Sequence, residues 1–144
     1  MFKQTADIQT ADMLNLPVPE AHYHVVKVEA SEIQKQLVES FAERAEKVHK
    51  HEVDSTEDNM LLITNDGRKA ALDQRLINPS LPDFEESKVN ACVRNIYETW
   101  EKNTDKKSAQ LVFCDLSTPK DDGSFNVYDD MKTKLIQRGI PPEE

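Results

Sequence analysis

The apolar positions of this chain change their spacing along the sequence, and these changes separate expected helices from expected extended segments. Between residues 31 and 50 they recur every three or four positions, which is the spacing of one face of an α-helix. Ser31 and Gln34 stand in the positions of a capping box, in which each side chain bonds the backbone N–H of the other residue. We therefore expect an amphipathic helix that ends near Lys50, with the apolar face Ile33, Leu37, Phe41, Ala45 and Val48.

The same spacing predicts two further helices. One begins at Ser87, a favourable N-cap, and buries the stripe Val89, Val93, Ile96 and Trp100. The other carries Val127, Met131, Leu135 and Ile136. Gly139 with apolar Ile140 behind it predicts a Schellman ending for this helix.

Two segments have the composition of strands. Residues 22–28 are rich in β-branched and aromatic side chains, and residues 110–115 contain four successive apolar positions, Leu111 to Cys114, between turn residues. Such a run is typical of a strand that is buried on both faces of a parallel sheet. The expected fold class is therefore α/β, mostly helical, with a small sheet centred on the strand at 110–115.

The remaining stretches are less defined. Residues 1–21 form an incoming arm with weak helical spacing that Pro17 and Pro19 interrupt. Residues 59–64 are apolar and fit either a helix or a strand, residues 68–77 again have helical spacing, and residues 78–86 form a connector with two prolines. A strand at 110–115 needs neighbours on both edges, and 22–28 supplies at most one. We interpret the chain as part of a larger sheet domain, whose uncovered edge can pair with another copy.

The charge and the cysteines of the chain argue against several classes of function. The formal net charge of −9 argues against strong nonspecific binding to nucleic acid, which depends on Lys and Arg. The two cysteines, Cys92 and Cys114, lack metal-site spacing and are expected to be reduced and buried. No apolar run approaches the length of a signal peptide core or a membrane span, so a soluble cytoplasmic protein without membrane contact is expected.

The residues that an ATPase needs are missing from the sequence. The three glycines, Gly67, Gly123 and Gly139, are isolated, so there is no phosphate loop, and no Asp-Glu pair follows a buried strand to hold magnesium. The pairs His22/His24 and His49/His51 lack a third ligand and are interpreted as surface histidines rather than a metal site. We therefore expect no catalytic residue, no metal and no bound cofactor in this chain.

One loop could contact phosphate. Asp115 ends the expected strand, and ligands of open α/β sheets gather beyond the carboxyl ends of strands. There, Ser117, Thr118 and Lys120 offer hydroxyl and ammonium donors to a nucleic-acid backbone. The alternative is a solvated loop whose hydroxyls bond the local backbone.

Several segments, taken in order, resemble Swi/Snf-type ATPases of helicase superfamily two. Val25–Phe41 is similar to the segment that bridges their two motor lobes, and Leu72–Pro79 (Leu-Asp-Gln-Arg-Leu-Ile-Asn-Pro) resembles their leucine-arginine-cysteine-asparagine-proline helix. Ser87-Lys88-Val89 resembles the opening of the second lobe, and Gln110–Thr118 resembles the strand of motif IV. Residues 60–69 and 125–130 look similar to the large helicase–DNA methylase proteins of phages, plasmids and conjugative elements.

The resemblance implies a partial RecA-like lobe with three parts: the arm 1–21, an inter-lobe strand and helical segment 22–86, and the first helix-strand-helix unit of the second lobe, 87–144. It further implies that the parent protein is a bacterial or mobile-element ATP-dependent DNA helicase or translocase that uses ATP and magnesium. The phosphate loop and Asp-Glu box would precede Met1, and the arginine finger would follow Glu144. The partners implied are DNA, reached through the parent, and the remainder of the parent chain.

Two functional hypotheses follow. The first is a fragment of a DNA motor that is not catalytic on its own, with Ser117, Thr118 and Lys120 near a DNA strand by the motif IV match. The second is an acidic helical module that docks a partner protein, which the charge of −9 favours.

Overall fold

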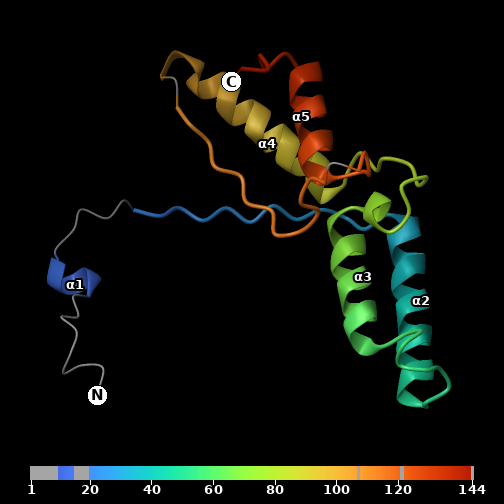
Figure 1. Ribbon diagram of the computed structural model, residues 1–144. Helices are drawn as coiled ribbons and strands as arrows, with labels where there is room; N and C mark the ends of the chain where they lie inside the picture. Colours follow the sequence, from blue (N-terminus) through green and yellow to red (C-terminus); the bar gives the residue numbers. More distant parts are fainter. Residues whose placement is uncertain (1–9, 15–19, 107, 121, 144) are drawn as a thin grey trace.

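Two pairs of helices, joined by an irregular connection (residues 73–87) that contains one short turn, make up the body of the protein (Figure 1). The computed structural model describes residues 10–14, 20–106, 108–120 and 122–143. In the first pair α2 (Glu32–His49) packs against α3 (Met60–Leu72), and in the second α4 (Lys88–Asn103) packs against α5 (Val127–Gln137). The short elements are α1 (Ala11–Leu14) and the 3-10 turns η2 (Gln74–Leu76) and η3 (Thr104–Lys106).

The predicted helix ends are confirmed. The backbone N–H of Gln34 donates to Ser31 Oγ at 3.0 Å, and Gln34 Oε1 accepts from the Ser31 N–H at 2.9 Å, so the capping box forms at the start of α2. Ser87 caps α4 by accepting from the Asn90 N–H at 3.1 Å. Gly139 adopts a φ of +104°, and Ile140 N–H donates to the carbonyl of Leu135 at 3.2 Å, which is the Schellman ending expected for α5.

The ambiguous stretch 59–64 is the beginning of a helix. Asn59 caps α3 by accepting from two backbone N–H groups, and the helix continues through Gly67 to Leu72. The helical spacing of 68–77 does not correspond to one continuous helix. The backbone of Asp73 is extended and ends α3, and its side chain starts η2 by accepting from the Arg75 N–H at 2.9 Å. Of the arm 1–21, the structure describes 10–14 and 20–21, and the rest of that prediction lies outside the described residues.

The predicted α/β class with a sheet at 110–115 is wrong. In the described residues there is no strand, and both 22–28 and 110–115 are extended chain without strand pairing. Leu111 is 83% exposed and Phe113 is 90% exposed, so the run is not buried on two faces. The apolar run predicts a buried strand, but such a strand needs a paired neighbour on each side and a packed layer on each face. The described chain supplies one layer, α4 and α5, and no paired neighbour.

A buried ionic cluster lies where the two helix pairs meet. Arg75 of η2 donates to Asp73 at 2.7 Å and to Asp130 of α5 at 2.8 Å, and Lys134 contacts both Asp130 at 2.8 Å and Asp83 at 2.6 Å. Burial opposes the charge of Arg75, but its bonds to the two carboxylates outweigh that cost and raise its pKa above the usual value. The cluster therefore fixes the second helix pair against the turn that follows the first.

A neutral chain of hydrogen bonds runs beside this cluster. Ser31 Oγ donates to Gln74 Oε1 at 2.7 Å, and Gln74 Nε2 donates to the carbonyl of Pro82 at 2.8 Å. Both Ser31 and Gln74 are buried. The start of α2, the turn η2 and the connector 78–86 are thereby held together by bonds that are shielded from water.

Candidate protein-interaction surface

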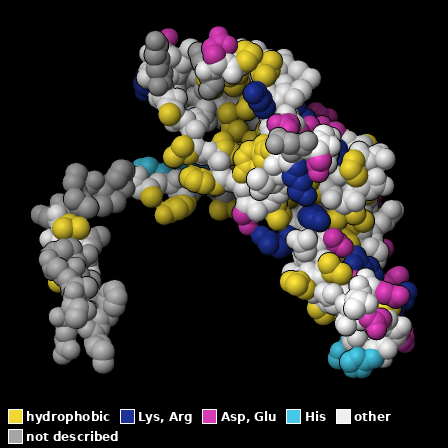
Figure 2. All heavy atoms as spheres, in the orientation of Figure 1, with side chains coloured by type: hydrophobic (Ala, Val, Ile, Leu, Met, Phe, Trp, Pro, Cys, Tyr) yellow, Lys and Arg dark blue, Asp and Glu magenta, His cyan; other side chains and the backbone are white. Residues whose placement is uncertain are grey.

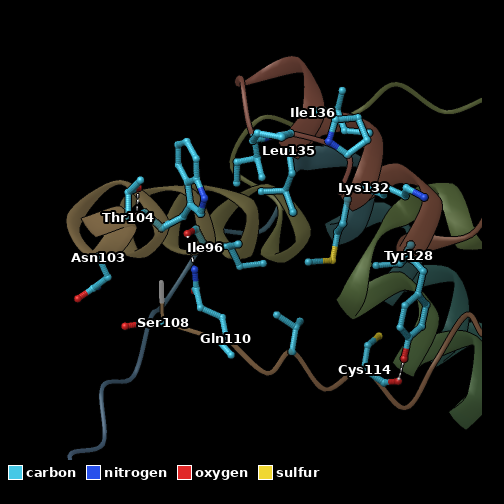
Figure 3. A pocket seen from close by; sticks show the side chains of 18 residues that line it. Ile96, Asn103, Thr104, Ser108, Gln110, Cys114, Tyr128, Lys132, Leu135 and Ile136 are labelled. Atoms are coloured by element: carbon cyan, nitrogen blue, oxygen red, sulfur yellow. Dashed lines mark hydrogen bonds between the residues drawn. The ribbon is translucent and has the colours of Figure 1, made fainter. Parts of the chain in front are cut away.

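The extended segment Ser108–Cys114 lies along the second helix pair. One face of the segment points toward the helices and the other points toward solvent. A hollow of about 840 Å³ at α4 and α5 is lined by Ser108 and Ala109 and then, from residue 110 onward, by the alternate side chains of Gln110, Val112 and Cys114 (Figure 3). The side chains between them, Leu111 and Phe113, are among the most exposed apolar groups of the described chain. This alternation is that of a β-strand with one face on helices and the other in water.

The segment is anchored to the helices through polar contacts. Gln110 Nε2 donates to the carbonyl of Ile96 on α4 at 3.0 Å, and the Tyr128 hydroxyl on α5 donates to the carbonyl of Cys114 at 2.6 Å (Figure 3). At its far end, Asp115 accepts from Arg68 of α3 at 2.6 Å in an exposed ion pair. The segment is therefore held at both ends, while the backbone of Leu111, Val112 and Phe113 makes no hydrogen bond with the described residues.

The hollow beneath the segment is mainly apolar. Hydrophobic side chains gather where the extended chain meets the second helix pair, whereas charged groups are frequent over α2 and α3 (Figure 2). The lining residues from the two helices and the C-terminal turn include Ile96, Trp100, Met131, Leu135, Ile136 and Ile140. Apolar side chains converging on an open hollow are typical of a surface that another polypeptide covers.

The two cysteines do not form a reactive site. Cys92 on α4 is half-buried, and burial, followed by the nearby Cys114 thiol, raises the pKa of Cys92 above its ordinary value. Cys114 directs its thiol to the carbonyl of Leu116 at 3.1 Å. Since the thiolate is the nucleophile and the metal ligand, a raised pKa makes Cys92 a poor candidate for either role at neutral pH.

The three residues predicted to approach DNA lie in one loop between the segment and α5. Ser117 has a φ of +63°, and its Oγ accepts from the Val127 N–H at 2.9 Å, which attaches the loop to the first turn of α5. Thr118 and Lys120 are exposed. The Ser117 hydroxyl thus bonds the backbone of a residue ten positions away, and the contact of the three residues with a nucleic acid stays a prediction.

The sequence interpretation missed the residues that hold the segment in place. The sequence analysis placed Tyr128 only within the resembling run 125–130, and residue 68 only within the stretches 60–69 and 68–77. In the described residues no three His, Cys, Asp or Glu side chains gather as a metal site, and His22, His24, His49 and His51 are exposed. No helix within the described ranges is long and apolar enough to cross a membrane.

Comparison with known proteins identifies no related sequence or structure. No family model matches the chain, no curated protein matches it, and no solved structure matches it.

Proposed function

We propose that this chain is a non-catalytic part of an ATP-driven DNA helicase or translocase of the Swi/Snf type, and that it works by contact with another polypeptide. The observation that carries the second half of this proposal is the segment Ser108–Cys114. It is uncharged over seven residues, it pairs with no strand among the described residues, and it presents Leu111 and Phe113 to solvent. Unpaired backbone and outward apolar side chains together are the features by which proteins add a strand from a partner.

The resemblance to DNA motors supports the first half. Val25–Phe41, Leu72–Pro79 and Gln110–Thr118 follow one another in the order of the motor segments that they resemble. This support comes from sequence alone, since the sheet expected from it is absent among the described residues. The assignment to DNA motors therefore needs evidence that does not depend on the fold.

The coding sequence on either side of this chain tests the assignment. We expect a Gly-Lys-Ser/Thr phosphate loop and an Asp-Glu box upstream, and a glycine-arginine motif downstream, in the same reading frame or in an adjacent gene. Flanking sequence without any of these motifs would contradict it. As a biochemical check, the isolated chain should hydrolyse no ATP above the level of a buffer blank, with or without duplex DNA.

A second candidate is an acidic docking module that is unrelated to DNA motors. The apolar hollow between α4 and α5 and the charge of −9 favour it. Electrophoretic mobility with duplex DNA at low salt distinguishes the two candidates. A part of a DNA motor should bind weakly, and Lys120→Gln should weaken that binding, whereas an unrelated docking module should not bind DNA at any salt concentration.

A further inference from the structure

We propose that two copies of this chain associate by antiparallel pairing of their Ser108–Cys114 segments around Val112. The inference rests on the proposed protein-contact role of this segment and names its occupant, a second copy. It does not depend on the assignment to a DNA motor.

The segment is complementary to itself. In an antiparallel pair centred on Val112, Leu111 of one copy stands opposite Phe113 of the other, and the same contact occurs twice about the two-fold axis. Both side chains are almost fully exposed, at 83% and 90%, so they are available on the outer face. An aliphatic side chain directly opposite an aromatic one is a favourable cross-strand pair.

The backbone of the segment is ready for such pairing. The N–H and C=O groups of Leu111, Val112 and Phe113 have no hydrogen-bond partner among the described residues. The inner side chains, Gln110 and Cys114, are already bound to or packed against the second helix pair, so the extended conformation exists before a partner arrives. Little further ordering is needed, which lowers the entropic cost of association.

Charge favours the antiparallel arrangement over a parallel one. The segment itself carries no charge, the two lysines at 106 and 107 precede it, and Asp115, which is paired with Arg68 at 2.6 Å in each copy, follows it. An antiparallel pair brings the basic flank of each copy toward the acidic flank of the other, whereas a parallel pair brings like charges together. The net charge of −9 on each copy opposes association at long range, and salt screens this repulsion.

The expected dimer is weak and strengthens with salt. A contact between two short strands lies below the size of a standard interface, so the dimer should form only at high protein concentration. Sedimentation equilibrium of the full chain should give a mass that rises from 16.5 kDa toward twice that value as concentration increases. The rise should begin at lower protein concentration in 0.5 M than in 0.05 M sodium chloride.

Charge substitutions test the register. Leu111→Lys alone and Phe113→Glu alone should each be monomeric, because each places an ion in the apolar cross-strand contact. A mixture of the two variants should associate again, since position 111 of one copy faces position 113 of the other and the new charges are opposite. Leu61→Lys, at an apolar position on α3 that is 79% exposed, is the matched control and should dimerise as the unaltered chain does.

Each other outcome overturns the proposal. A chain that is monomeric at every concentration, or a dimer that survives Leu111→Lys, excludes this contact. If Leu61→Lys abolishes the dimer as completely as Leu111→Lys does, the interface lies elsewhere. If the mixture of Leu111→Lys and Phe113→Glu stays monomeric, the antiparallel register is excluded. Far-ultraviolet circular dichroism verifies that all three variants retain their helices. If no such dimer forms, the assignment to a DNA motor is unaffected, because the flanking coding sequence tests that assignment separately.

Discussion

The guanidinium of Arg75 is enclosed between the carboxylates of Asp73 and Asp130, with the ring of Phe125 4.5 Å from its central carbon. Asp73 is 1% exposed and Arg75 is 8% exposed, so this is the most deeply buried ionic contact described. The bond between Arg75 and Asp130 joins residues that are 55 positions apart and lies between the two helix pairs. Several consequences of this arrangement can be measured.

Replacing Arg75 should strongly destabilise the fold. Arg75→Leu leaves the buried carboxylate of Asp73 without a cation and Asp130 with Lys134 alone, and breaking a buried pair in this way costs about 3–5 kcal/mol. Urea denaturation followed by circular dichroism measures the change. Arg94→Leu is the control, because Arg94 makes an exposed ion pair with Glu86 and its loss should cost about 0–1 kcal/mol. Equal effects of the two substitutions would contradict a central role for Arg75.

Acid should weaken the same contact. Burial alone would raise the pKa of Asp130, but its bonds to Arg75 and Lys134 outweigh burial and hold this pKa below its ordinary value. A carboxylate whose folded pKa is depressed contributes stability above the pKa of the unfolded state, and this contribution is lost as pH falls through the folded value. The free energy of unfolding should therefore fall as pH decreases below about 4.

Asp130→Asn tests the source of that pH dependence. The variant should be less stable at pH 7 and should lose less stability on acidification than the unaltered chain. Glu39→Gln, at an exposed position on α2, provides the control and should leave the pH profile unchanged. A profile that Asp130→Asn leaves unaltered would assign the acid sensitivity to other carboxylates.

The two serine caps should differ in their energetic contribution. Ser87→Ala removes the bond to the Asn90 N–H and should cost about 1 kcal/mol. Ser31→Ala removes a cap and also the buried bond to Gln74 Oε1, which leaves that oxygen without its donor and should add about 1–3 kcal/mol. Urea denaturation of both variants gives the comparison, and a larger loss for Ser87→Ala would be inconsistent with this network.

Two glycines should respond in opposite directions to alanine. Gly67 lies inside α3, and an added Cβ would meet no atom within 4 Å, so Gly67→Ala should stabilise the protein by about 0.5–1 kcal/mol. Gly139 has a φ of +104° at the end of α5, where an L side chain is strained, so Gly139→Ala should destabilise by about 1–2 kcal/mol. Thermal denaturation should show an upward and a downward shift of Tm respectively.

Local signals in the sequence were sufficient to predict α2, α4 and α5, but not α3. The capping residues Ser31 and Ser87 and the Gly139–Ile140 ending each act within a few positions of the backbone groups that they satisfy, so the sequence alone indicates them. The separation of the ambiguous stretch 59–64 from the helical spacing of 68–77 was misleading, because a single glycine such as Gly67 in a helix costs only about 1 kcal/mol and neighbouring contacts outweigh it. Arg44, for example, bonds Asp66 at 2.9 Å and Asp58 at 2.7 Å across the α2–α3 pair.

Long-range contacts were beyond the reach of pattern analysis. The apolar run Leu111–Cys114 indicates extended chain, but whether such a run is buried depends on what lies beside it. Similarly, the ion pairs Arg75–Asp130 and Arg68–Asp115 join positions 55 and 47 residues apart. The spacing of residues along the sequence does not predict such pairs. The sequence therefore predicted a buried strand at the position of the candidate surface, and the structure has an exposed, unpaired segment there among the described residues.

An extended segment with a free backbone is also the form in which proteases accept their substrates. Leu111 and Phe113 are large, outward side chains on such a segment, so chymotrypsin is expected to cut there before it cuts the helices. The two products would separate α4 from α5 in the chain while Lys134 on α5 still bonds Asn90 on α4 at 2.7 Å. Whatever polypeptide covers this edge would therefore also determine how long the protein survives digestion.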